Sequence, residues 1–187
     1  MNRKWINVKD AIAIVIIAIL SFFVESTIGL VLIPLISIPL VGGLLSGFVD
    51  AMIVFLGGYL VPRRLGPLLF GIILLSLSTI TPSFGPPGAY KIIIGFGLGL
   101  SIDLLLLIIG RKPWSYIIAT GLTFGGSIPM TYIAWEYWGI STTALKPYLF
   151  PFIGAYFVLG VLGSSFSYWI YRKRLSRFSL ILNLRNG

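Results

Sequence analysis

The chain has 187 residues, of which 57% are hydrophobic and only 10% are charged, and its mean hydropathy is +1.01. Soluble domains typically carry about 25% charged residues, so this composition excludes an ordinary soluble domain. The sequence has no Cys and no His, which excludes disulfides, thiolate and imidazole metal sites, Cys nucleophiles and His acid–base catalysis. The net charge of +9 comes from residues spread along the chain rather than from a single stripe. We therefore expect no nucleic-acid binding and interpret the charge as one that orients membrane helices.

The first apolar run extends from Val8 to Val24 and resembles the core of a signal peptide. Asp10 lies at its entry, no small-residue cleavage site follows it, and more apolar sequence comes directly after Glu25. We therefore expect this run to remain in the mature protein as the first membrane span.

Charged, proline and glycine residues divide the rest of the chain into further apolar runs. These runs cover residues 41–61, 65–80, 89–109, 114–138 and 148–171. A spanning helix needs roughly 20 apolar residues. Together with residues 8–24, the pattern predicts an all-α integral membrane protein with six transmembrane helices in a single domain over residues 1–187.

The distribution of basic residues favours the same count, because Lys and Arg concentrate in short cytoplasmic loops. With both termini in the cytoplasm, 12 of the 14 basic residues lie on the inner side, and only Lys91 and Lys146 lie outside. The inner residues are Arg3, Lys4, Lys9, Arg63, Arg64, Arg111, Lys112, Arg172, Lys173, Arg174, Arg177 and Arg185. We therefore expect a multi-pass protein of the cell membrane with cytoplasmic N- and C-termini.

The segment from Glu25 to Gly43 is apolar, but it contains Pro34 and Pro39. Backbone that proline prevents from hydrogen bonding is tolerated at membrane depth only where protein or a water-filled cavity covers it. The segment is therefore either a proline-containing outer loop or half-helix packed over the bundle, or an extension of the first helix that ends near Pro34. The prediction of six helices adopts the first alternative, an outer loop after the first helix.

Two acidic residues, Asp50 and Asp103, lie near the middle of predicted spans, where an ionisable residue marks an internal bond or a functional pathway. Small residues precede each at helical spacing and permit close helix packing. These are Gly43 and Gly47 before Asp50, and Gly95 and Gly99 before Asp103. Each carboxylate either bonds a neighbouring backbone or hydroxyl group or takes part in proton, cation or substrate coupling. The likeness of the two segments hints at an internal duplication.

Polar and aromatic residues gather in the outer halves of several predicted spans. Tyr and Trp at that depth are commonly interfacial anchors, but this does not explain a carboxylate among them. Glu136, between Trp135 and Tyr137, offers a planar or cationic ligand both a stacking surface and a counter-charge. We expect the substrate-binding residues among Ser78, Tyr90, Tyr132, Trp135, Glu136, Trp138 and Tyr156.

The sequence contains no catalytic or cofactor-binding pattern. No two acidic residues lie within seven residues of each other, whereas Mg²⁺-dependent transferases cluster their carboxylates. Neither a nucleophile elbow nor a glycine-rich phosphate loop followed by Lys is present. We therefore expect no enzymatic activity, no metal site and no cofactor, and active transport would need an ion gradient or a partner.

Three glycine-containing runs look like those of the substrate-binding S components of energy-coupling factor (ECF) transporters. They are residues 42–50, residues 95–103, and residues 154–163 running into Tyr171-Arg172-Lys173-Arg174. The resemblance covers nearly the whole chain and includes the six spans in under 200 residues, the basic inner termini and a hydrophobic loop after the first span. It implies a membrane protein that captures a vitamin or related micronutrient near the outer face. Such a protein then delivers its cargo through a transmembrane coupling protein and a cytoplasmic ATPase pair.

The chain departs from this family in its first helix. Ala11, Ala13 and Ala18 do not give the Ala-x-x-x-Ala spacing with which many members dock on the coupling protein, so use of a shared module does not follow from the resemblance. The absence of His argues against the metal-ion members and leaves an organic substrate. An aromatic cage with Glu136 would suit a thiamine- or pyrimidine-like compound.

Two other functions stay open from the sequence. A structural or assembly protein would use Asp50 and Asp103 as internal struts and would bind no ligand. An autonomous carrier would couple transport to an ion gradient through the same two acids, without ATPase partners.

Overall fold

The computed structural model describes residues 5–35, 39–82 and 86–178, and within these ranges it describes the side chains outside residues 29–45 and 144–145. Every regular element in these ranges is a helix, which confirms the all-α prediction. The α-helices are α1 (Val8–Leu35), α2 (Pro39–Leu60), α3 (Gly66–Leu77), α4 (Tyr90–Ile109), α5 (Pro113–Tyr137) and α6 (Leu149–Lys173). Three 3₁₀ helices complete the set, namely η1 (Ser78–Ile80), η2 (Thr143–Tyr148) and η3 (Leu175–Arg177).

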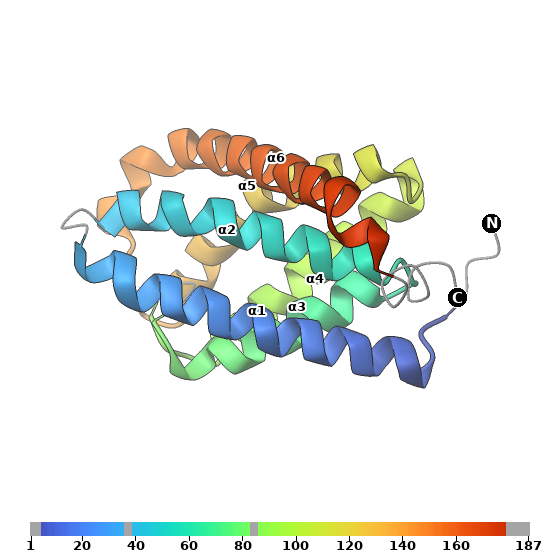
Figure 1. Ribbon diagram of the computed structural model, residues 1–187. Helices are drawn as coiled ribbons and strands as arrows, with labels where there is room; N and C mark the ends of the chain where they lie inside the picture. Colours follow the sequence, from blue (N-terminus) through green and yellow to red (C-terminus); the bar gives the residue numbers. More distant parts are fainter. Residues whose placement is uncertain (1–4, 36–38, 83–85, 179–187) are drawn as a thin grey trace.

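The α-helices lie side by side in one bundle, and the chain reverses direction at each connection (Figure 1). Helix α2 packs against α1, α3, α5 and α6, while α4 packs against α3 and α5. The start of α1 and the end of α6 lie at the same end of the bundle (Figure 1). We call this the basic end, because the turns with Arg63, Arg64, Arg111 and Lys112 lie there, and we call the other the distal end.

Among the described residues, four helical segments are long and apolar enough to cross a membrane. They are Val8–Ile28, Tyr90–Ile109, Pro113–Tyr137 and Lys146–Arg177, and the segments Ser46–Leu60 and Gly66–Ile80 are shorter apolar helices. Large apolar side chains cover outward faces of the bundle, among them Ile12, Ile16, Leu20, Phe23, Ile93, Leu104, Ile108, Phe150, Val158 and Leu162. Exposed apolar surface on this scale is typical of helices that lipid covers.

The proline-containing outer loop predicted after the first span is wrong for residues 25–35, because α1 continues through them to Leu35. The alternative, in which the first helix extends to near Pro34, is confirmed. A carboxylate such as that of Glu25 does not end a helix, and a single internal Gly29 costs only about 1 kcal/mol. Pro34 lies in the last turn, and Pro39 opens α2, where its missing N–H costs no helical hydrogen bond. Residues 36–38 lie outside the described part of the chain.

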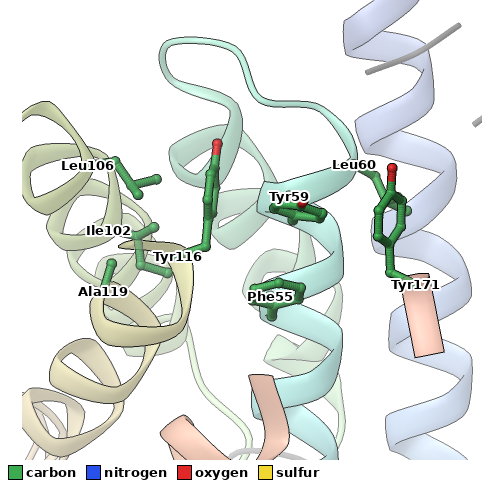
Figure 2. Close-up of a cluster of buried hydrophobic side chains, with 8 residues drawn as sticks. All are labelled: Phe55, Tyr59, Leu60, Ile102, Leu106, Tyr116, Ala119 and Tyr171. Atoms are coloured by element: carbon green, nitrogen blue, oxygen red, sulfur yellow. The ribbon is translucent and has the colours of Figure 1, made fainter. Parts of the chain in front are cut away.

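The core of the basic half is built around Tyr59 of α2 (Figure 2). The Tyr59 ring stacks on Phe55 with centroids 5.0 Å apart and meets Tyr116 and Tyr171 edge-on at 5.3 Å and 5.1 Å. Ile102 of α4 belongs to the same buried cluster. Aromatic pairs in such geometries contribute beyond the area they bury, so this cluster fixes α2, α4, α5 and α6 at their basic ends.

Helices α3 and α4 approach each other through glycines. A Cβ atom on Gly71 would lie 2.6 Å from the carbonyl oxygen of Gly95, and one on Gly99 would lie 2.5 Å from Cα of Leu68. Only glycine fits at these distances. The Gly95 and Gly99 stripe predicted before Asp103 therefore serves helix packing.

Candidate ligand-binding site

At the basic end, two buried acids form ion pairs with arginines. Asp10 Oδ2 lies 2.9 Å from Nε of Arg63, and Asp103 Oδ1 lies 2.7 Å from Nη2 of Arg111. Asp103 Oδ2 also accepts a hydrogen bond of 3.1 Å from the N–H of Leu68, at the start of α3. Arg111 donates to the carbonyl of Arg63 at 2.7 Å. Asp103 therefore makes internal bonds, as the first of the two alternatives for this acid predicts, rather than standing free for coupling. These bonds join α4 to the start of α3.

Away from this end, Glu25, Asp50 and Lys91 are also buried, with exposed fractions of 4%, 6% and 0%. Glu25 on α1 interacts electrostatically with Asp50 on α2 and with Lys91 on α4. Within the described part of the chain, neither Oε2 of Glu25 nor Oδ1 of Asp50 accepts a hydrogen bond. We call these three residues the interior charge cluster. Buried ionisable groups are normally paired and hydrogen-bonded. The interior charge cluster is unusual because one oxygen of each of its two carboxylates accepts no hydrogen bond in the described chain.

Lys91 is anchored at the end of α3. Its Nζ donates to the carbonyl oxygens of Ser78 at 2.9 Å and Thr81 at 2.7 Å. These carbonyls follow the C-terminus of α3, where the helix dipole favours a cation. The Ser78 hydroxyl, predicted to bind substrate, donates to the carbonyl of Leu74 at 2.9 Å and is fully buried. The structure therefore connects Ser78 to the cluster through its carbonyl rather than through its hydroxyl.

Tyr156 of α6 lies next to Asp50. It interacts electrostatically with Asp50, and it packs on Gly47, where a Cβ atom would lie 3.4 Å from Cε1 of the ring. Tyr148, Phe152 and Tyr156 are spaced by four residues, with ring centroids 6.4 Å and 6.5 Å apart. This aromatic stripe begins at the distal end with Tyr148, which is 51% exposed, and leads along α6 to Asp50.

Glu136 lies elsewhere, at the end of α5. Its side chain is 48% exposed and lies 3.8 Å from Nζ of Lys146. Its Oε1 accepts hydrogen bonds from the Tyr132 hydroxyl at 2.6 Å and the Thr142 hydroxyl at 2.8 Å. The structure thus brings Tyr132 and Glu136 together as predicted, but groups of the chain itself already bind Oε1 of the carboxylate. Contact of Glu136 with a ligand stays a prediction.

The other predicted aromatic residues form a packed corner at the same end. Tyr90 is buried, and Trp135 packs against the cluster that contains it. The Tyr90 hydroxyl donates to the carbonyl of Pro86 at 2.5 Å, and its ring centroid lies 6.2 Å from that of Trp138. Their binding roles also stay predictions.

The predicted glycines lie in two different parts of the structure. Gly47 lies at the Tyr156 ring, whereas Gly95 and Gly99 lie in the α3–α4 contact. Gly43 lies among the residues whose side-chain surroundings are not described.

Two members of the interior charge cluster, Glu25 and Lys91, were not among the predicted site residues. From the sequence, Glu25 follows the last residue of the first predicted span, and Lys91 is one of the two basic residues on the outer side. The sequence does carry a signal for Glu25, because uncharged, mostly apolar sequence continues on both of its sides. An acid so placed lies inside a helix rather than at its end.

Comparison with known proteins identifies no relative, since no family model, no curated protein and no solved structure matches the chain. Within the described residues, no group of three or more acidic side chains could hold a metal ion. The chemistry of this region is therefore that of the interior charge cluster and the aromatic stripe, which combine carboxylate oxygens that accept no hydrogen bond in the described chain with an aromatic ring beside Asp50.

Proposed function

We propose that this chain is the substrate-capture subunit of an ECF-type importer, which binds a vitamin or related small organic micronutrient from outside. The interior charge cluster carries this proposal. Keeping two carboxylates and a lysine inside an apolar bundle is costly, and such groups within membrane helices commonly mark a substrate or ion pathway.

In this proposal all six α-helices cross the cell membrane and both termini are cytoplasmic. Support comes from the basic end, where the start of α1 and the end of α6 lie together (Figure 1). The same end holds the arginines and lysine of the α2–α3 and α4–α5 turns. It also holds Arg172, Lys173 and Arg174 at the end of α6, as the positive-inside rule requires for a cytoplasmic face.

The depth of the cluster fits capture from outside. Glu25 lies ten residues before the end of α1 at Leu35, which is about 15 Å of helix. Lys91 is the second residue of α4, and Tyr156 lies seven residues into α6. The cluster thus lies towards the distal end, which is the outer face in this topology.

Delivery requires other proteins. The sequence has no phosphate-binding loop, so we propose a transmembrane coupling protein and a cytoplasmic ATPase pair as partners, as the family resemblance implies. The four helices that contribute Glu25, Asp50, Lys91 and Tyr156 surround the bound molecule. Its release then depends on a rearrangement that the partners drive.

A carrier driven by an ion gradient is the second candidate, because paired acids beside a lysine also suit a proton or cation pathway. Proteoliposomes that contain only this chain separate the two functions. A carrier accumulates the compound retained by the purified protein when an ion gradient is imposed. A capture subunit binds that compound but does not accumulate it until the partner proteins are added.

The capture function is tested by native mass spectrometry of protein purified gently from its own membranes. We expect a discrete small-molecule adduct beyond lipid and detergent, at up to one molecule per chain. Protein that carries only lipid, under conditions that preserve tight complexes, would instead support the structural role.

A further inference from the structure

The buried charges of the described chain balance at the basic end but not in the cluster. Asp10 and Asp103 each have an arginine, whereas the cluster holds two acids, Glu25 and Asp50, and one lysine, Lys91, which interacts with Glu25. An uncompensated charge inside an apolar bundle is strongly disfavoured. One negative charge in the cluster must therefore be neutralised by a proton or by a bound cation.

The acceptor atoms of this cluster point to a cation that donates hydrogen bonds. Oε2 of Glu25 and Oδ1 of Asp50 lack a donor in the described part of the chain, although both side chains are more than nine-tenths buried. Lys91 directs two of its hydrogen bonds to the carbonyls of Ser78 and Thr81. An ammonium group from outside the chain would supply both the missing charge and the missing donors.

The aromatic stripe adds a preference for a planar or apolar part next to the charge. Tyr156 lies at Asp50 and Gly47, and Phe152 and Tyr148 continue the stripe to the distal end. The faces of aromatic rings attract cations and stack on planar groups. The stripe thus places aromatic rings from the distal end to Asp50, and these rings favour a ligand that is both cationic and planar.

We propose that the captured substrate is a small organic cation with a planar apolar part. Its ammonium group binds between Glu25 and Asp50, and its planar part lies against the ring of Tyr156. This inference rests on the proposed capture function and names its substrate class. A carboxylate or phosphate ligand is disfavoured, because two acids repel it while only one lysine attracts it.

Three probes of one shape test this charge preference, namely benzylamine, benzyl alcohol and benzoate. Each is titrated into the purified full-length protein in detergent, and the Tm is measured. Benzylamine should raise the Tm in a saturable manner, because binding to the folded state stabilises it. Benzyl alcohol and benzoate should not. An equal response to benzyl alcohol or benzoate, or no response to benzylamine, would overturn the proposal.

Substitutions test whether the rise in Tm with benzylamine arises at the interior charge cluster. Asp50→Asn keeps the shape of the side chain but removes the excess charge, so the benzylamine concentration for half-maximal stabilisation should rise by about tenfold or more. Glu25→Gln is the second variant, used in the same way if Asp50→Asn yields too little folded protein. Asp103→Asn is the matched control, since it makes the same change in the arginine-paired acid, and its response should equal that of the parent once compared at equal folded fraction. An undiminished response in both Asp50→Asn and Glu25→Gln would place the cation elsewhere.

The compound retained in native mass spectrometry separates this inference from the proposed function. A retained cation supports both. A retained anion or neutral compound overturns the substrate class and leaves capture intact, whereas no retained compound overturns capture itself.

Discussion

Asp50 and Asp103 lie in similar local sequences but in opposite surroundings. Asp103 has an arginine and a backbone N–H as partners, whereas Asp50 has another acid within electrostatic reach and an oxygen that accepts no hydrogen bond in the described chain. The difference comes from Arg111, which folds back from the turn eight residues after Asp103, and from Glu25, which approaches Asp50 from another helix. The neighbouring sequence therefore predicts that both acids are internal, but it does not predict which is paired.

This contrast predicts opposite effects of the same substitution on stability. Asp103→Asn leaves Arg111, whose side chain is only 12% exposed, without its counter-charge and should lower the free energy of unfolding by about 3 kcal/mol. Asp50→Asn removes a charge that has no arginine and should leave the unliganded protein at least as stable as the parent. Thermal unfolding in one detergent measures both, and equal losses in the two variants would contradict this assignment of the charges.

A substitution of Glu136 separates the two candidate sites. The carboxylate is half-exposed and already accepts hydrogen bonds from Tyr132 and Thr142. If the interior charge cluster holds the ligand, Glu136→Gln should leave the affinity for the retained compound unchanged. A loss of tenfold or more, measured by equilibrium titration, would move the site to the end of α5, where the sequence alone predicts it.

Part of the candidate site could be predicted from the residue type at single positions and its place in a predicted span. Asp50 and Tyr156 stand out as an intramembrane acid and a tyrosine in the outer half of a span, and the structure brings them together. Glu25 and Lys91 were missed because their role depends on how far α1 continues and on which carbonyls end α3. Neither is a property of a single position.

At the scale of helices, the apolar runs predicted the elements well, because charged residues and Pro/Gly turns separate them. Each predicted span overlaps one of the α-helices, and α1 extends furthest beyond its predicted span. The exception is the end of the first span, because α1 continues past the charge of Glu25 and contains no proline before Pro34. Charge marks a membrane boundary only when it faces water, and Glu25 is buried in the bundle.

The glycine contact between α3 and α4 predicts a specific loss of stability. Gly99→Ala would place a Cβ atom 2.5 Å from Cα of Leu68 and 2.6 Å from the carbonyl oxygen of Pro67. The helices must then move apart, at a cost of about 1–3 kcal/mol. Thermal unfolding of the purified variant measures this cost.

Gly126 in α5 is the matched control for this substitution. A Cβ atom there would meet nothing within 4 Å, so Gly126→Ala should be neutral or should stabilise the helix by up to about 1 kcal/mol. If Gly99→Ala is tolerated as well as Gly126→Ala, the close approach of α3 and α4 is not what the structure describes.

At the scale of the whole molecule, the two ends of the bundle differ in charge and in chemistry. The basic end carries the arginine and lysine turns, two ion pairs and the aromatic cluster of Figure 2. The distal half carries the interior charge cluster and the aromatic stripe. This polarity agrees with the proposed topology, in which the basic end is cytoplasmic and the substrate enters at the distal end.

The proposed topology predicts which positions are accessible from each side of the membrane. The chain has no Cys, so Lys112→Cys and Lys146→Cys each introduce a single thiol at an exposed position near opposite ends. A membrane-impermeant maleimide applied to intact cells should label the Lys146→Cys variant and should label the Lys112→Cys variant only after permeabilisation. Labelling of both variants in intact cells would contradict an arrangement with the two turns on opposite sides.

The claim that the interior acids hold a captured small molecule is tested most directly by native mass spectrometry of three proteins purified side by side. These are the parent, Asp50→Asn and Asp103→Asn. The parent and the folded fraction of Asp103→Asn should carry the same small-molecule adduct, whereas Asp50→Asn should have lost most of it. Equal occupancy in all three proteins, or an adduct in none of them, would contradict the account.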